Sequence, residues 1–151
     1  MPEYLEMTAD KFTFRVATDR LYSAEGVWVL PVPGTTRVRV GVADYPQQHN
    51  GDEAFANVNP AGTRLAAGDQ FAELETIKAM VDLHAPISGT VVEVNAALNA
   101  SPEIINQSPY EAGWLAVIEP SAWSVDHSKL LDPAAYFAVM QAQVQQDLKG
   151  L

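Results

Sequence analysis

The most conspicuous absence from this 151-residue sequence is cysteine, of which there is none. Without thiols the chain cannot form disulfides, zinc–thiolate sites or iron–sulfur ligation, and it has no cysteine nucleophile. If the protein takes part in redox or sulfur chemistry, a group attached to it must supply the sulfur.

Basic residues are also scarce, with 9 Lys and Arg against 19 Asp and Glu and a net charge of −10. Phosphates would repel such a surface, so we expect no binding to nucleic acid or to anionic membranes. No run approaches the roughly 18 apolar residues that span a bilayer. The segment 1–11 has no basic region followed by an apolar run, which predicts a soluble, cytoplasmic protein.

Catalytic constellations are missing too. The sequence shows no Ser-His-Asp set, no paired carboxylates and no glycine-rich phosphate loop. His49, His84 and His127 are scattered without carboxylates at ligand spacing, so a metal site is not expected. We therefore expect no enzymatic activity from the chain itself.

What the sequence does contain is a succession of short β-rich runs separated by Gly, Pro and Asn. Such dense punctuation predicts a single mainly β domain with a compact barrel or sandwich. The expected strands are 12–16, 27–30, 37–42, 54–58, 71–76, 89–94 and 115–118. The expected core residues are Val38, Val40, Val42, Phe55, Phe71, Leu74, Val91, Val94, Leu115 and Val117.

The end of the chain changes character. Asp132 can cap a helix that has Pro133 at its first position, and Tyr136 begins an apolar stripe that recurs every four residues toward Lys149. Ser101-Pro102 repeats the cap-then-proline pattern for a shorter helical turn. Pro46 should weaken a short helix after Asp44.

The segment Glu75-Thr76-Ile77-Lys78-Ala79 lies between two strand-like runs, which places Lys78 at a hairpin tip. A turn presents its side chain to other proteins with little steric obstruction. A lysine on a turn is usually only a solvated charge, and the acidic Glu73, Glu75 and Asp82 around it are then ordinary surface groups. As a functional feature they would steer a ligase or a basic partner surface onto the hairpin, and we favour this role only for Glu75 because of its spacing from Lys78.

This segment resembles the lipoylation motif of lipoyl domains, whose lysine is acylated with lipoic acid. Biotin carriers have methionines on both sides of their lysine, whereas Ile77 and Ala79 flank Lys78 here. Residues 82–95, 102–110 and 113–115 are similar to later signatures of the glycine cleavage H-protein family. The resemblance implies a barrel-sandwich hybrid with short helical turns and a C-terminal helix, lipoate on Lys78, and a non-catalytic carrier that has Glu75, Ala79 and His84 near the cofactor.

The His84 assignment has a simpler alternative, a packed or partly exposed ring with no contact to the lipoyl arm. The resemblance runs from about residue 22, so we expect a carrier domain over 22–151 and an N-terminal extension over 1–21 that packs on it. Gly26 and Val27 stand where the family usually has His and Glu.

The altered N-terminal region favours the H-like lipoate-binding proteins of sulfur oxidation, which serve a heterodisulfide-reductase-like complex. The alternative is an aminomethyl carrier of the glycine cleavage system, with glycine decarboxylase, aminomethyltransferase and dihydrolipoamide dehydrogenase as partners. Either role also requires a lipoate ligase or lipoyl transferase.

Overall fold

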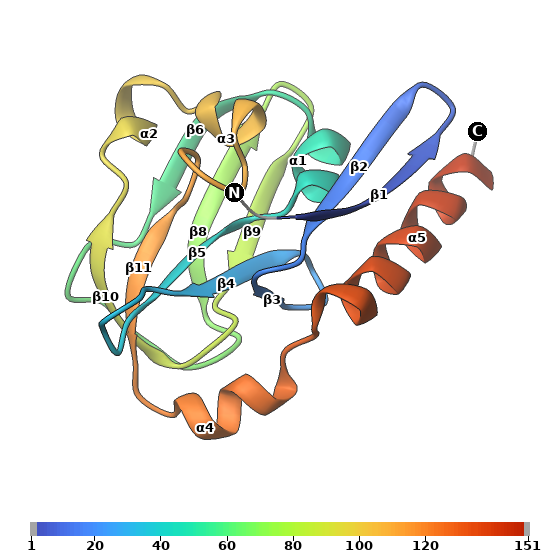
Figure 1. Ribbon diagram of the computed structural model, residues 1–151. Coiled ribbons are helices and arrows are strands. Elements are labelled where there is room, and N and C mark those ends of the chain that lie inside the picture. The colour runs from blue at the N-terminus through green and yellow to red at the C-terminus, as the bar shows by residue number, and fades with distance from the viewer. Residues whose placement is uncertain (1–2, 150–151) are drawn as a thin grey trace.

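A computed structural model describes residues 3–149 as a mainly β protein with short helices and a long C-terminal helix (Figure 1). The strands are β1 (Tyr4–Ala9), β2 (Phe12–Ala17), β3 (Leu21–Tyr22), β4 (Val27–Pro31), β5 (Val38–Val42), β6 (Glu53–Val58), β7 (Arg64–Leu65), β8 (Gln70–Thr76), β9 (Met80–His84), β10 (Gly89–Val94) and β11 (Ala116–Pro120). The helices are α1 (Asp44–Asn50), α2 (Ala97–Ala100), α3 (Ile104–Gln107), α4 (Trp123–Asp126), the 3₁₀ turn η1 (His127–Lys129) and α5 (Pro133–Lys149).

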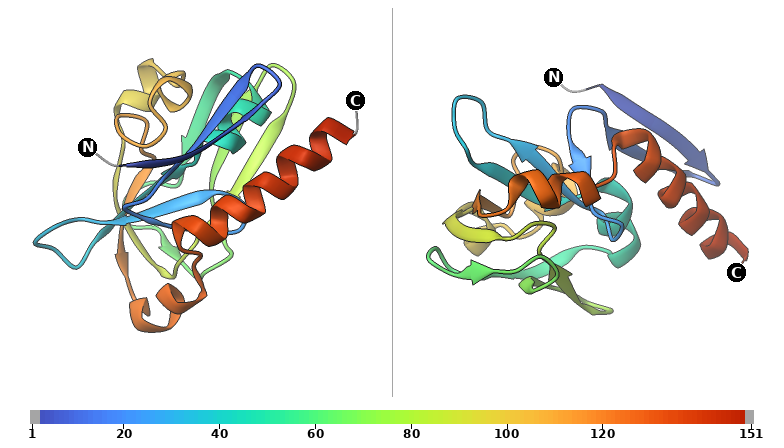
Figure 2. Two further views of the ribbon diagram at one scale, coloured as in Figure 1. Left: turned by 45° about the vertical axis from the view of Figure 1, so that its right-hand side comes forward. Right: turned by 90° about the horizontal axis from the view of Figure 1, so that it is seen from below.

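Two antiparallel sheets form the body of the molecule. The larger has the strand order β3-β4-β5-β11-β10-β7, and the smaller has the order β6-β8-β9. Figure 2 shows the smaller sheet as a separate layer below the larger one when the molecule is seen from below. Buried residues of both sheets, Val40 and Ile118 from one and Phe71 and Leu74 from the other, belong to one hydrophobic cluster, so the main core lies between the layers.

One expected core residue was placed wrongly by its pattern. Phe55 is 62% exposed, because a bulge between Glu53 and Phe55 shifts the register of β6 against β8. The extra residue reverses which side chains face inward. Glu53 is consequently buried and Phe55 faces solvent, whereas the other expected core residues are buried or half-buried.

A second apolar cluster lies beside the sandwich, where α5 contacts the hairpin of β1 and β2. It includes Phe14 from β2, Tyr45 from α1, and Tyr136, Met140 and Val144 from α5. The four-residue spacing within α5 puts these last three on one face of the helix. The hairpin of β1 and β2 forms a two-stranded sheet of its own.

The helix boundaries match the sequence signals in part. The Asp132 Oδ1 accepts a hydrogen bond from the Ala135 N–H at 2.8 Å, as an N-cap should. Ser101 instead uses its backbone carbonyl, which accepts from the Ile104 N–H at 3.0 Å, and its side chain caps nothing. The helix α1 forms despite Pro46, because this proline is its third residue and helices leave the first N–H groups unpaired.

Within residues 3–149, none of the helices has both the length and the apolar character needed to traverse a bilayer.

Candidate functional site: the hairpin of Lys78

The loop that carries Lys78 joins β8 to β9 in the smaller sheet. Thr76 donates its backbone N–H to the Ala79 carbonyl at 2.8 Å, and the Thr76 Oγ1 accepts the Ala79 N–H at 3.1 Å. The Thr76 Oγ1 also lies 3.3 Å from the Ala79 carbonyl oxygen. Hydrogen bonds between the same two residues therefore close the loop, and only Ile77 and Lys78 extend beyond them. The side chain of Lys78 is exposed, and it forms no ion pair with any described residue.

The surroundings of Lys78 are partly apolar. Ile77 is 99% exposed and Met80 is 63% exposed, and on the outer face of the sheet Phe55 and Met80 pair with Glu75 from opposite sides. Exposed apolar side chains that lie together, as these three do beside one lysine, commonly mark interaction sites.

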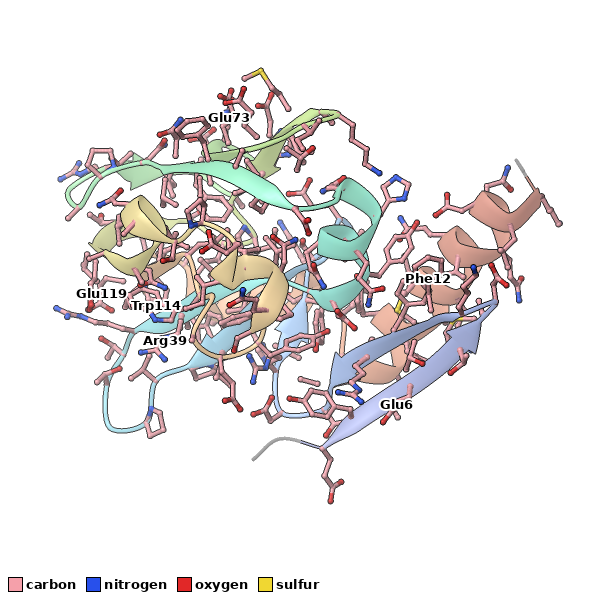
Figure 3. All side chains as sticks on the ribbon, turned by 90° about the horizontal axis from the view of Figure 1, so that it is seen from above. Glu6, Phe12, Arg39, Glu73, Trp114 and Glu119 are labelled. Atoms are coloured by element: carbon pink, nitrogen blue, oxygen red, sulfur yellow. The ribbon has the colours of Figure 1, made fainter. Side chains whose placement is uncertain are left out.

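Acidic residues continue the same outer face. Glu73 lies across from Asp82 in the register of β8 and β9, one row farther from the loop than Glu75 and Met80. Figure 3 shows Glu73 at the side of the molecule opposite the hairpin of β1 and β2. The lysine thus stands at the end of a sheet face that carries three carboxylates.

The base of the loop is supported by the segment that follows α1. The methylene chain of Lys78 passes over Gly51, where an added Cβ would lie 3.5 Å from Lys78 Cε. Asn106 donates to the Gly51 carbonyl at 3.0 Å and accepts the Glu53 N–H at 2.9 Å, and so ties this segment to α3. Glu53 in turn pairs with Thr76.

Glu53 itself is unusual, because it is only 4% exposed and neither carboxylate oxygen has a hydrogen-bond partner among the described residues. Burial, and secondarily the charge of Asp52, raises the pKa of Glu53 to about 7. Sequence reasoning missed Glu53, Asn106 and the closing role of Thr76. Only Thr76 left a signal, a hydroxyl-bearing residue directly before a two-residue loop.

Of the four residues expected near a cofactor, three lie at the Lys78 loop and one does not. Glu75, Lys78 and Ala79 come together in the loop or beside it. His84 lies at the opposite end of β9, where its N–H donates to the Glu25 Oε1 at 2.7 Å and its Nδ1 lies 3.1 Å from the Glu25 Oε2. Its contact with an arm on Lys78 stays a prediction.

A hollow of about 400 Å³ opens on the flank of β9, with Val81 and Leu83 on one wall and Asn50, next to Gly51, on another. Val81, in its wall, is only three residues along the chain from Lys78. Among residues 3–149, no group of three or more His, Asp or Glu side chains is arranged to hold a metal ion.

Comparison with known proteins identifies the family of this chain. The sequence profile described as Glycine cleavage H-protein matches residues 20–143. The chain belongs to the glycine cleavage H-protein family. Proteins of this family are non-catalytic carriers that hold lipoate on a lysine, so this chain is an H-protein lipoyl carrier.

Individual relatives agree closely over most of their length. The glycine cleavage system H protein of Geobacillus thermodenitrificans is 43% identical over 119 residues, which cover 79% of this chain and 91% of the relative. That of Beutenbergia cavernae is 41% identical over 128 residues, 85% of this chain and 98% of the relative. The crystal structure of the Mycobacterium marinum H protein superposes with a TM-score of 0.72 at 36% identity, covering 80% of this chain and 95% of that one. This match confirms the barrel-sandwich hybrid.

Proposed function

We propose that this chain is the aminomethyl carrier of a glycine cleavage system and holds lipoate in amide linkage on Lys78. The observation that carries the proposal is an exposed lysine at the tip of a hairpin, without an ion pair to any described residue, in a chain 41–43% identical to two glycine cleavage system H proteins. Its partners would be glycine decarboxylase, aminomethyltransferase and dihydrolipoamide dehydrogenase.

The residues of the hairpin fit the attachment of such a group. Lys78 forms no ion pair with a described carboxylate that would hold its ammonium group, and its side chain is exposed. Acylation removes the positive charge and leaves an acidic sheet face beneath the modified side chain. Lipoate supplies a disulfide that can open, carry a group and be reoxidised.

The chain's own contribution is to fix the base of the arm. The hydrogen bonds between Thr76 and Ala79 hold the loop, while the lysine methylenes pass beside Gly51. A tethered group visits partner sites at a high effective concentration without new contacts. Glu73, Glu75 and Asp82 would orient the hairpin on a lipoate ligase or lipoyl transferase with a basic surface.

The sulfur-oxidation role that the N-terminal departures favoured has less support. The relatives compared above carry the name of the glycine cleavage system, and none is described as acting with a heterodisulfide-reductase-like complex. We also propose that residues 1–21 are an extension to a carrier domain over 22–151, since the family match begins at residue 20.

Mass spectrometry of the intact protein from a lipoate-supplied host tests the attachment. We expect one lipoyl adduct per chain, its loss in Lys78→Arg and its retention in the matched control Lys129→Arg. An unmodified wild type, or an adduct that survives in Lys78→Arg, would refute the proposed site.

The pathway needs a second assay. Purified lipoylated protein is expected to support exchange of labelled bicarbonate into the carboxyl group of glycine by glycine decarboxylase, while Lys78→Arg is not. No exchange with protein whose lipoylation has been verified would count against the aminomethyl role and leave the carrier role standing.

A further inference from the structure

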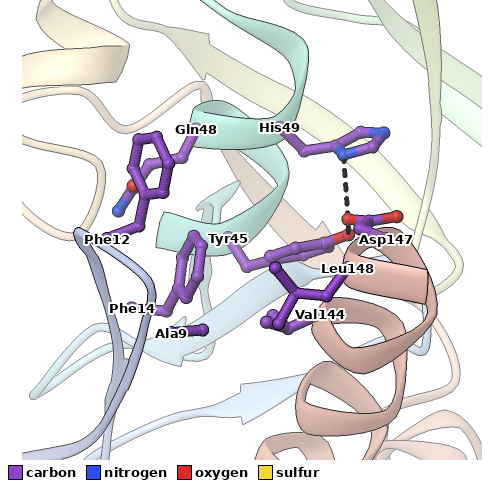
Figure 4. A pocket seen from close by; sticks show the side chains of 9 residues that line it. All are labelled: Ala9, Phe12, Phe14, Tyr45, Gln48, His49, Val144, Asp147 and Leu148. Atoms are coloured by element: carbon purple, nitrogen blue, oxygen red, sulfur yellow. Dashed lines mark hydrogen bonds and ion pairs between the residues drawn. The ribbon is translucent and has the colours of Figure 1, made fainter. Parts of the chain in front are cut away.

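A second cavity, of about 200 Å³, lies between the hairpin of β1 and β2, α1 and α5, and Lys78 is not among the residues that line it (Figure 4). Its walls include Phe12 and Phe14 from the hairpin and Asp147 and Leu148 from the last turn of α5. All four lie outside residues 20–143, the part that matches the family profile. The carrier function does not account for this cavity.

Aromatic rings form much of its wall. Phe12 and Phe14 are stacked with their centroids 6.4 Å apart, and Tyr45 meets Phe14 edge-on at 5.4 Å. In Figure 4 these rings lie around the open space, with Val144 and Leu148 below it. The exposed area of the lining is therefore largely hydrocarbon, and Phe12 is 55% exposed at the mouth.

The charge at the edge of this cavity is negative. The Asp147 Oδ2 accepts a hydrogen bond from the Tyr45 hydroxyl and lies 3.3 Å from the His49 Nδ1. No lysine or arginine is among the nine residues that line the cavity. With a net charge of −10 on the whole chain, an anionic ligand would meet repulsion here.

We propose that this cavity binds a small molecule with an alkylated ammonium head group. Ring faces attract cations through their quadrupole, and the carbon substituents of such a head group bury apolar area against Phe12, Phe14 and Leu148. The Asp147 carboxylate supplies the counter-charge. A neutral molecule of the same shape gains only the apolar contact, because the tyrosine hydroxyl and the histidine are already engaged with Asp147.

A matched pair of probes tests this directly. Choline and 3,3-dimethyl-1-butanol differ in having a positive nitrogen or a neutral carbon at the centre of the head group. We expect choline, titrated at constant ionic strength into the isotopically labelled full-length protein, to shift NMR signals of the cavity residues. The neutral alcohol should bind roughly two- to fivefold more weakly.

Variants locate the site and its charge. Asp147→Asn keeps a hydrogen-bond acceptor for Tyr45, and it should weaken choline binding about threefold or more. Glu93→Gln removes one exposed carboxylate from β10, away from the cavity, and should leave choline binding unchanged. Lys78→Arg should bind choline as the wild type does, which separates this proposal from the carrier function.

Three results would overturn it. Equal binding of the two probes would mean an apolar cavity that does not select a cation. Unchanged choline affinity in Asp147→Asn would show that Asp147 does not act as the counter-charge. If the signals of the cavity residues do not shift, choline does not bind at this site.

Discussion

At the scale of single residues, Glu53 is the most unusual side chain, because an ionisable carboxyl group is buried there. It occupies an inward position at the root of the Lys78 hairpin and has neither solvent nor a described hydrogen-bond partner for its carboxyl oxygens. A buried carboxylate without compensation is costly, and the group responds by holding its proton.

The free energy of unfolding should therefore depend on pH through Glu53. Its pKa rises from an ordinary 4.5 to about 7 in the folded state, so between these values the folded chain holds a proton that the unfolded chain has released. Stability then decreases as pH rises through this window, by about 3 kcal/mol in total, and is flat above it.

Urea unfolding of wild type and Glu53→Gln from pH 4.5 to 8 measures this contribution. The glutamine variant should lose the decrease, and the difference between the two curves isolates Glu53 from the other carboxyl groups. Parallel curves would show that Glu53 does not titrate in this way.

Thr76 gives a second prediction at the same scale. Thr76→Val removes the hydroxyl that accepts the Ala79 N–H, and we expect about 0.5–1.5 kcal/mol less stability and faster hydrogen exchange at Ala79. Thr76→Ser keeps the hydroxyl and should retain most of the wild-type protection at Ala79. Similar exchange in both variants would contradict a closing role for this side chain.

The residues near Lys78 also show what the sequence could predict. Glu75, Lys78 and Ala79 lie within one short segment, so local pattern alone brings them together. Asn106 reaches Gly51 from more than fifty positions away along the chain, and no local pattern reports such a contact. The burial of Glu53 depends on a bulge, which shifts register without a distinctive residue.

At the scale of elements, α5 was the most predictable part. Its cap, its proline and its apolar stripe are all local, and they predict a helix from Pro133 to about Lys149, as observed. The strands β3 and β7, only two residues long each, escaped prediction because they are too short to show an alternating pattern. They are defined by their partners across the sheet.

The cap of α5 yields the third prediction. Asp132→Ala should lower the free energy of unfolding by about 1 kcal/mol, since it leaves the Ala135 N–H without its acceptor. Asp132→Ser retains a capping oxygen and should remain within a few tenths of the wild type. Thermal unfolding compares the three proteins, and an unaffected alanine variant would show that this hydrogen bond adds no net stability.

At the scale of the whole molecule, part of the net charge of −10 lies on the sheet face next to the Lys78 loop. Glu73, Glu75 and Asp82 share the outer face of the smaller sheet, beside the exposed Ile77 and Met80. Charges on such a rim govern the rate of encounter more than the final affinity.

We expect the proposed lipoylation of Lys78 by a lipoate ligase to slow as salt rises, because exposed charges are screened over about 10 Å at 0.1 M. The double variant Glu73→Gln, Asp82→Asn should be slower at low salt, by about two- to fivefold, and less sensitive to salt. Glu93→Gln serves as the control. A wild-type rate that does not depend on salt would exclude steering by this face.

The packing of the hairpin of β1 and β2 against the end of α5 also has an evolutionary consequence. Val144 is buried in the cluster that contains Phe14, so either element alone would expose apolar surface to water. Selection then acts on the two as a unit. A lineage that loses the hairpin is expected to acquire a polar residue at the position of Val144, and alignment of such descendants would record the two changes together.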